Sequence, residues 1–128
     1  MINNKIFDNL VVLDLANNHF GDVSHAKKII KQFSTIIKKN KINSTIKFQF
    51  RDLENFIHKE FINSDLKYVK RFRETKLSDN EFKEIFSYIK YNKIKTSCTP
   101  FDEASIEKIE KLGFDYLKIA SVSALDFN

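Results

Sequence analysis

The chain has 128 residues, a mass of 15.1 kDa and a formal net charge of +5, which suits a single domain. With 42% apolar residues, two Gly and one Pro, it is neither a disordered tail nor a low-complexity chain. The single cysteine, Cys98, excludes a disulfide scaffold and a Cys-based zinc finger. Since no apolar run approaches the ~20 residues of a membrane span and no signal-peptide pattern opens the chain, we expect a cytoplasmic protein.

The first part of the chain predicts two strands joined by a helix. Residues 10–16 (LVVLDLA) form a short apolar run with one acid inside, typical of a buried strand. The turn-forming NNHFGD follows, and from about Val23 apolar residues recur at the spacing of one helix face. Residues 45–50 (TIKFQF) alternate and are rich in β-branched and aromatic side chains, which predicts a second strand.

The second part predicts two further β/α units. Residues 51–76 are too long for a simple connection, so we expect one or two short helices there, one of them around residues 65–72. The capping box SDNE at residues 78–81 opens the next helix, and residues 94–98 (IKTSC) form a third strand that Thr99-Pro100 ends. Asp102 caps a helix that stops at Gly113, and residues 116–120 (YLKIA) form a fourth strand.

Strands that alternate with helices predict an α/β fold with a parallel sheet, and no linker marks a second domain. Each predicted strand carries polar residues near its carboxyl end, the edge at which parallel α/β folds bind ligands. They are Asp14, Asn17, Asn18 and His19 after the first strand, Lys47 and Gln49 in the second (joined by Arg51 if that strand continues), Ser97 and Thr99 in the third, and Lys118, Ser121 and Ser123 after the fourth.

Two lysines in predicted strands favour an anion site. A buried ammonium group is costly unless it is paired, and Asp14 can neutralise only one of Lys47 and Lys118. A phosphate or carboxylate ligand, held also by Ser and Thr hydroxyls, would neutralise the other. The alternative is that both lysines lie on an edge face and extend to water.

The other reactive side chains each have a plainer interpretation. His19 either contacts substrate and transfers a proton or caps its loop. His25 and His58 have no neighbours of metal-ligand type and are predicted to lie at the surface. Cys98 is predicted to be a buried strand residue. The basic cluster within residues 67–76 either meets RNA or an acidic partner, or is a solvated helix whose Tyr68 and Phe72 form a core pair.

Four segments, taken in order, resemble the N-acetylneuraminate (sialic acid) synthase family. LANNHFGD, IKFQFRDL, TSCTPFD and YLKIAS are similar to that family's EIGNNHNGD, KFQ, TPFD and YKIAS or YKIGS. The resemblance runs from about Val11 to Ser123 and implies a (β/α)8 barrel with a small C-terminal antifreeze-like domain. It implies a transferase that condenses phosphoenolpyruvate with an N-acetylated aldose, usually N-acetylmannosamine, in nonulosonate and cell-surface carbohydrate biosynthesis. A divalent metal, Mn²⁺ or Mg²⁺, and a homodimer are implied as well.

The resemblance also implies roles for single residues. Asp14 and His19 are the candidate catalytic groups, with Asp14 standing where the family has Glu. The phosphoenolpyruvate positions are Lys47, Thr99, Lys118 and Ser121. The sugar positions are Gln49, Asn17, Asn18 and Ser123, of which Ser123 replaces a Glu found in many members. These two departures leave open which nonulosonate precursor is the acceptor sugar.

Length sets the main expectation about activity. A (β/α)8 barrel takes roughly 250 residues, so residues 1–128 are expected to be the N-terminal half of such a barrel, about its first four β/α units. The second half-barrel with the family's metal-binding histidines and the antifreeze-like domain are expected to be absent. Residues 1–128 alone are therefore expected not to turn over. One alternative is a non-catalytic half-barrel that self-associates or docks on a complementary half, and a second is a basic nucleic-acid-binding module, which leaves the Lys47 and Lys118 pattern unexplained.

Overall fold

A computed structural model describes residues 4–125, and it shows one four-stranded parallel sheet in the order β1-β2-β3-β4. The strands are β1 (Val11–Asp14), β2 (Ser44–Phe50), β3 (Lys95–Pro100) and β4 (Tyr116–Leu117). The helices are α1 (Val23–Asn40), α2 (Leu53–Phe56), α3 (Lys67–Glu74), α4 (Asp79–Tyr91) and α5 (Glu103–Leu112), with 3-10 turns η1 (Asn4–Phe7), η2 (Lys59–Phe61) and η3 (Ser121–Ser123). The predicted α/β class is confirmed, and the arrangement is that of the first four units of a (β/α)8 barrel.

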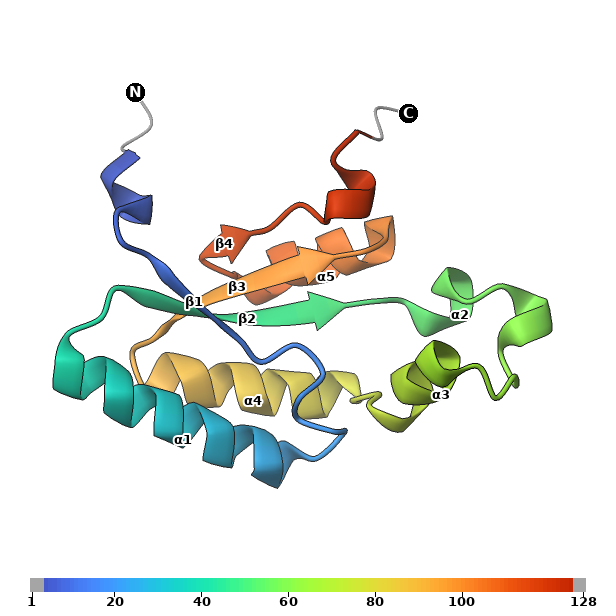
Figure 1. The fold of residues 1–128 in the computed structure, drawn as a ribbon, viewed down its shortest axis with the longest axis horizontal. Coiled ribbons are helices and arrows are strands. Elements are labelled where there is room, and N and C mark those ends of the chain that lie inside the picture. Colours follow the sequence, from blue (N-terminus) through green and yellow to red (C-terminus); the bar gives the residue numbers. More distant parts are fainter. Residues whose placement is uncertain (1–3, 126–128) are drawn as a thin grey trace.

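One face of the sheet is covered by helices and holds the core. α1 and α4 run side by side along this face, and α5 lies behind β3 and β4 (Figure 1). Ile46 and Phe48 of β2 are fully buried there against Ile30 of α1 and Ile85 of α4. Every second residue of β2 therefore enters an apolar layer, as strand geometry requires.

The helix ends follow the predicted capping chemistry. Asp22 caps α1 by accepting from the backbone N–H of His25, and Asp102 caps α5 by accepting from that of Ser105. The predicted capping box at the start of α4 is present in both directions between Ser78 and Glu81. Gly113 ends α5 with φ of 73°, a left-handed conformation that suits glycine.

Three local predictions differ from the structure. β3 continues through Pro100, which pairs with Phe50, because the last residue of a strand can lack an N–H donor without losing the ladder before it. β4 is shorter than predicted. It ends at Leu117, which pairs with Cys98, near the carboxyl end of β3. Tyr68 is not a core residue, since it is 73% exposed.

The open edge at β1 explains a further difference. Val11 and Val12 are nearly half exposed, although the apolar run predicted a buried strand. Among the residues that the structure describes, β1 pairs only with β2 and β4 only with β3, so each leaves one edge without a partner strand. η1 and η3 lie on the side of the sheet away from α1 and α4 (Figure 1). No helix in the described part of the chain is long and apolar enough to cross a membrane.

Candidate functional site

The face of the sheet opposite α1 and α4 is polar, and we call it the inner face. Strand register places Asp14, Lys47 and Ser97 side by side across β1, β2 and β3. One step nearer the carboxyl ends, Gln49 lies beside Thr99. The backbone N–H of Lys118 donates to the carbonyl of Cys98 at 2.8 Å, which carries the β4 ladder one residue further and puts Lys118 beside Thr99.

An ion pair fixes the first row of the inner face. The Nζ of Lys47 lies 2.8 Å from the Oδ2 of Asp14, and the lysine side chain is 14% exposed while the aspartate side chain is 50% exposed. The ammonium group is thus largely removed from water with one carboxylate beside it, as the sequence suggested. The exposed side of Asp14 leaves the pair open to exchange with a ligand.

Two hydroxyl groups between the lysines are buried without a partner. Ser97 Oγ and Thr99 Oγ1 have no hydrogen-bond partner within residues 4–125. Burying a hydroxyl unpaired costs free energy, so these groups are expected to bind something in the working protein. Lys118 is exposed, and it lies in the register position next to Thr99. Two cations and two hydroxyls therefore lie on one face of the sheet, from Lys47, Ser97, Thr99 and Lys118.

A cleft opens from the inner face at the carboxyl ends of β1 and β2. Its volume is about 380 Å³, and the structure brings together in it Asp14, Asn17, Asn18 and Gln49, four of the predicted site residues. Asn18 is exposed, and its Nδ2 donates to the backbone carbonyl of Asp14 at 3.3 Å. The predicted sugar positions Asn17, Asn18 and Gln49 therefore line one cavity.

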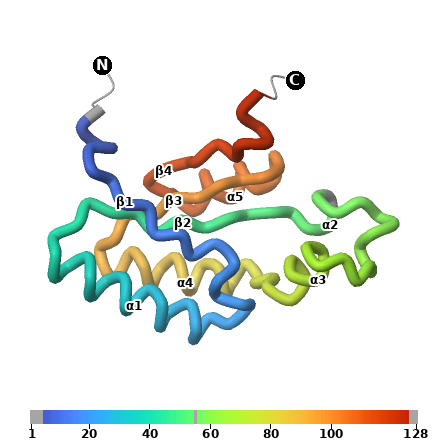
Figure 2. Tube along the Cα trace, viewed as in Figure 1, coloured from blue at the N-terminus to red at the C-terminus, as the bar shows by residue number. Residues whose placement is uncertain are grey.

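Four residues without a predicted catalytic or binding role line the same cleft, namely Arg51, Tyr68, Arg71 and Phe72. They follow β2, in the segment of α2, η2 and α3 that extends beyond the carboxyl end of that strand (Figure 2). The spacing of Lys47, Gln49 and Arg51 signalled that Arg51 would share their face. Nothing in the sequence pattern signalled Tyr68 and Arg71, because their approach depends on how α3 folds back.

His19 lies apart from the inner face. It is 2% exposed and its ring packs edge-on against Phe82, a residue that also packs against Phe48 and Phe50 of the covered face. Its Nδ1 accepts from the backbone N–H of Gly21 at 3.0 Å, which is the geometry of a loop cap. Burial lowers the pKa of His19, so the ring is held neutral. A role in proton transfer stays a prediction.

The loop that holds His19 packs closely on the end of α3. Gly21 has φ of 72°, and a Cβ there would lie 2.9 Å from the backbone carbonyl oxygen of Glu74. The glycine of the NNHFGD motif is therefore required by both conformation and space. This contact joins the β1–α1 loop to α3, which lines the cleft.

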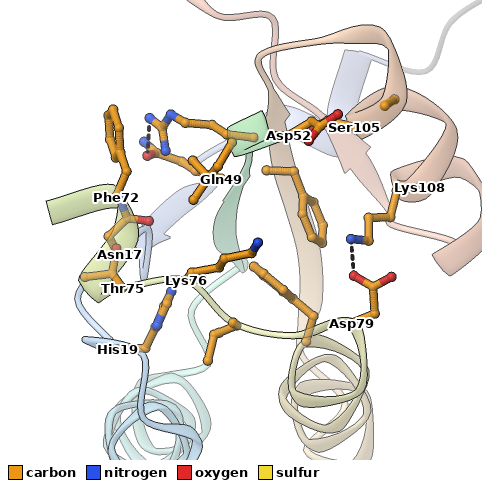
Figure 3. A pocket seen from close by; sticks show the side chains of 16 residues that line it. Asn17, His19, Gln49, Asp52, Phe72, Thr75, Lys76, Asp79, Ser105 and Lys108 are labelled. Atoms are coloured by element: carbon orange, nitrogen blue, oxygen red, sulfur yellow. Dashed lines mark hydrogen bonds and ion pairs between the residues drawn. The ribbon is translucent and has the colours of Figure 1, made fainter. Parts of the chain in front are cut away.

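A second cavity, of about 280 Å³, lies beside the cleft and between the loops (Figure 3). Asn17, His19 and Gln49 line it together with Lys108, whose ammonium pairs with Asp79. Because Asn17 and Gln49 also line the cleft, the two cavities share a wall.

The remaining predicted residues lie at the edges of this arrangement. Ser121 and Ser123 are exposed in η3, beyond the end of β4. Cys98 is buried in the covered face, and burial raises the pKa of its thiol, which makes it a poor nucleophile.

No three His, Cys, Asp or Glu side chains within residues 4–125 come together as ligands of one ion. This part of the chain does not fit a metal centre.

Comparison with known proteins agrees with the geometry. The family model described as the NeuB family matches residues 36–128. The chain belongs to the NeuB family.

Among solved NeuB-type structures, the chain is similar to a spore coat polysaccharide biosynthesis protein E of Chromobacterium violaceum, with 39% identity and a TM-score of 0.86 over 92% of this chain. It shares its fold with an N-acetylneuraminic acid synthetase of Leptospira borgpetersenii, at 24% identity and a TM-score of 0.69 over 90% of this chain. It is also 31% identical, over 81% of its length, to the uncharacterized protein MJ1065 of Methanocaldococcus jannaschii. The chain spans 35%, 36% and 28% of the lengths of these three relatives.

Proposed function

We propose that this chain supplies the phosphoenolpyruvate-binding half of a sialic-acid-synthase-like active site. The observation that carries the proposal is the pair of buried, unpartnered hydroxyls of Ser97 and Thr99 between Lys47 and Lys118. Phosphoenolpyruvate carries a phosphate and a carboxylate, and cations with hydroxyl donors are the groups that bind such oxygens. Ser121, beyond the end of β4, is proposed to complete the binding set.

The acceptor is proposed to be an N-acetylated aldose, bound in the adjacent cleft by Gln49, Asn17 and Asn18. Ser123 is proposed to lie at its far end. The support is that the first three residues line one cavity next to the ion pair. These residues do not distinguish one N-acetylated aldose from another, so N-acetylmannosamine and related nonulosonate precursors are equally suited.

The proposed reaction joins the two substrates through carbon. C3 of phosphoenolpyruvate attacks the aldehyde carbon of the open-chain sugar, and the aldehyde oxygen takes up a proton. Water adds at C2. The bond between C2 and the bridging phosphate oxygen then breaks, which releases inorganic phosphate and leaves the 2-keto acid. Lys47 and Lys118 would hold the anionic groups, and Asp14 would move the proton, since its carboxylate lies on the inner face and half exposed.

We propose further that residues 1–128 form the first half of the barrel and do not turn over alone. The described part holds no metal-type ligand cluster, and its sheet is open at β1 and β4. The remaining strands, on the same polypeptide or on another, would pair with those edges. Substrate binding, of phosphoenolpyruvate first, is then what this chain can be tested for.

Isothermal titration of the chain with phosphoenolpyruvate tests the proposal. We expect saturable binding that Lys47→Met weakens about 10- to 100-fold, because a charge-assisted hydrogen bond is worth about 1.5–3 kcal/mol. Lys39→Met is the matched control, since Lys39 is an exposed lysine of α1 on the other side of the molecule. Absence of binding by the folded wild-type chain, or equal losses in the two variants, would contradict the proposal.

A second candidate function rests on the open sheet edges. Val12 on β1 is 49% exposed and Leu117 on β4 is 50% exposed, and unpaired apolar edges favour pairing with further strands. A half-barrel of this kind would self-associate or dock on a complementary half. Sedimentation tests it: a concentration-dependent dimer supports it, and a monomer at all concentrations excludes self-association.

A further inference from the structure

We propose that Arg51 is a positioning residue that fixes the amide of Gln49, so that the cleft offers an N–H donor pair to a carbonyl oxygen of the acceptor sugar. This inference rests on the proposed function and names the substrate group that the site selects, an acetamido carbonyl. It is carried by the contacts around Arg51 at the carboxyl end of β2.

The contact with Arg51 sets the direction of the Gln49 side-chain amide. Arg51 Nη2 lies 2.9 Å from Gln49 Oε1. A guanidinium has donors and no acceptor, so the amide group must turn its oxygen toward Arg51. Its nitrogen, with two N–H donors, must then point the other way.

The two N–H donors of Gln49 Nε2 are available in the cleft. Gln49 lines the cleft together with Asp14, Asn17 and Asn18. No hydrogen bond from Gln49 Nε2 to another residue is present in the described part of the chain, and the atom is not buried. Figure 3 shows Gln49 near Phe72 and Asn17, and all three residues line both cavities. The amide thus adds a neutral donor pair to a cleft in which Asp14 is the charged acceptor.

Three aromatic rings surround the guanidinium group of Arg51. Its Cζ lies 4.0 Å from the ring centre of Phe101, 4.7 Å from that of Phe72 and 5.8 Å from that of Phe56. These rings come from three different segments: Phe56 ends α2, Phe72 lies in α3, and Phe101 follows β3. Cation–π contacts on several sides hold the guanidinium plane in place.

Burial of the Arg51 charge costs free energy. Arg51 Nε is buried without a hydrogen-bond partner, and no carboxylate within residues 4–125 forms an ion pair with the guanidinium. Desolvation lowers its pKa, while the charge of Asp102 acts against that change from a distance. Leu or Met could fill an aromatic cage without this cost. The contribution that Leu or Met could not make here is the hydrogen bond that orients Gln49.

Titration with N-acetylmannosamine, followed at the side-chain NH₂ signals of Gln49 by ¹⁵N NMR, tests the proposal. In the wild-type chain we expect one fixed amide conformation whose signals shift with N-acetylmannosamine and much less with mannose, which has no acetamido carbonyl. Arg51→Met should free the amide and weaken N-acetylmannosamine binding roughly tenfold, the worth of one hydrogen bond. Arg51→Lys should restore part of the loss, because a donor returns without the planar geometry.

Arg73→Met is the matched control. Arg73 lies in α3 and donates to the backbone carbonyls of Ile62 and Ser64, away from the cleft. A second variant, Gln49→Glu, keeps a partner for Arg51 but replaces the donor pair with an acceptor. We expect it to fold as the wild type does and to lose N-acetylmannosamine binding at pH 7.

Two results would overturn the inference. One is a Gln49 amide that rotates freely in the wild-type chain, whatever the sugar does. The other is N-acetylmannosamine binding of wild-type strength in Arg51→Met or Gln49→Glu. Failure of the proposed function would look different: the amide would be fixed in the wild type and freed in Arg51→Met, while phosphoenolpyruvate did not bind.

Discussion

The two faces of β2 have opposite chemistry although they alternate along the same seven residues. On the covered face Ile46, Phe48 and Phe50 are buried among helices, and their surroundings are apolar. On the inner face Lys47 pairs with Asp14, and Gln49 accepts from Arg51. One face holds the fold together and the other keeps polar groups available, so stability and binding are expected to respond to different substitutions on one strand.

The largest expected effect is on the covered face. Phe48 is fully buried and packs against the rings of Phe82 and Phe114. Phe48→Ala should lower the free energy of unfolding by about 3–5 kcal/mol, through lost burial and the cavity left behind. Urea denaturation measures this, with Phe20→Ala as the control, since Phe20 is 64% exposed. A loss of less than about 1 kcal/mol for Phe48→Ala would show that the covered face is not the core.

Two threonines of β3 make the sharpest contrast between the faces. Thr96 Oγ1 donates to Asp115 Oδ2 at 2.8 Å, whereas Thr99 Oγ1 is buried without a partner. Thr96→Val should therefore destabilise the chain by about 1–3 kcal/mol, and Thr99→Val should leave it unchanged or stabilise it by up to about 1 kcal/mol.

The two threonine variants should also differ in their affinity for phosphoenolpyruvate. Thr99→Val should weaken binding several-fold while Thr96→Val leaves the affinity unchanged, provided that it is measured where both variants are folded. Thermal unfolding and titration on the same samples give both quantities. If Thr99→Val destabilised the chain as much as Thr96→Val, the hydroxyl of Thr99 would have a partner within the protein and the anion-site account would fail.

A smaller effect is expected from protonation of His19. Burial lowers its pKa in the folded chain below the ordinary value of about 6.5. Between the two pKa values the unfolded chain binds a proton that the folded chain does not, so stability should fall as the pH drops from 7 toward 5.5, by at most about 1.4 kcal/mol per pH unit. His19→Asn should flatten this pH dependence. An unchanged slope in the variant would mean that His19 is not buried neutral.

The smallest expected effect on stability comes from the inner-face ion pair. Because Asp14 is half exposed, a double-mutant cycle of Lys47→Met and Asp14→Asn should give a coupling of about 1 kcal/mol or less, reduced further by salt. A coupling of several kcal/mol would identify the pair as a structural element and would weaken its role as an exchangeable anion site.

The sequence predicted the fold better than the site, and the reason is the range of the interactions involved. Strand alternation in TIKFQF, the capping box at Ser78 and the glycine stop at Gly113 are local patterns, and each is present as expected. The pairing of Lys47 with Asp14 was also accessible, since both side chains lie in strands predicted to be neighbours.

The other features depend on contacts between distant segments. The aromatic cage of Arg51 joins Phe56, Phe72 and Phe101, and no periodicity along the chain relates these positions. The orientation of His19 toward the covered face depends on Phe82 in α4, which lies far away in the sequence. The exposure of Val12 follows from an unpaired sheet edge, which a residue pattern within the strand cannot reveal.

The most direct test of the central claim is a ¹H–¹⁵N map of the wild-type chain during titration with phosphoenolpyruvate. We expect shifts concentrated at Lys47, Ser97, Thr99 and Lys118 on the inner face, with α1 and the outward surface of α4 unchanged. Shifts that follow the exposed lysines of α1 instead, or no shifts at millimolar phosphoenolpyruvate, would show that the inner face is not the anion-binding face of this protein.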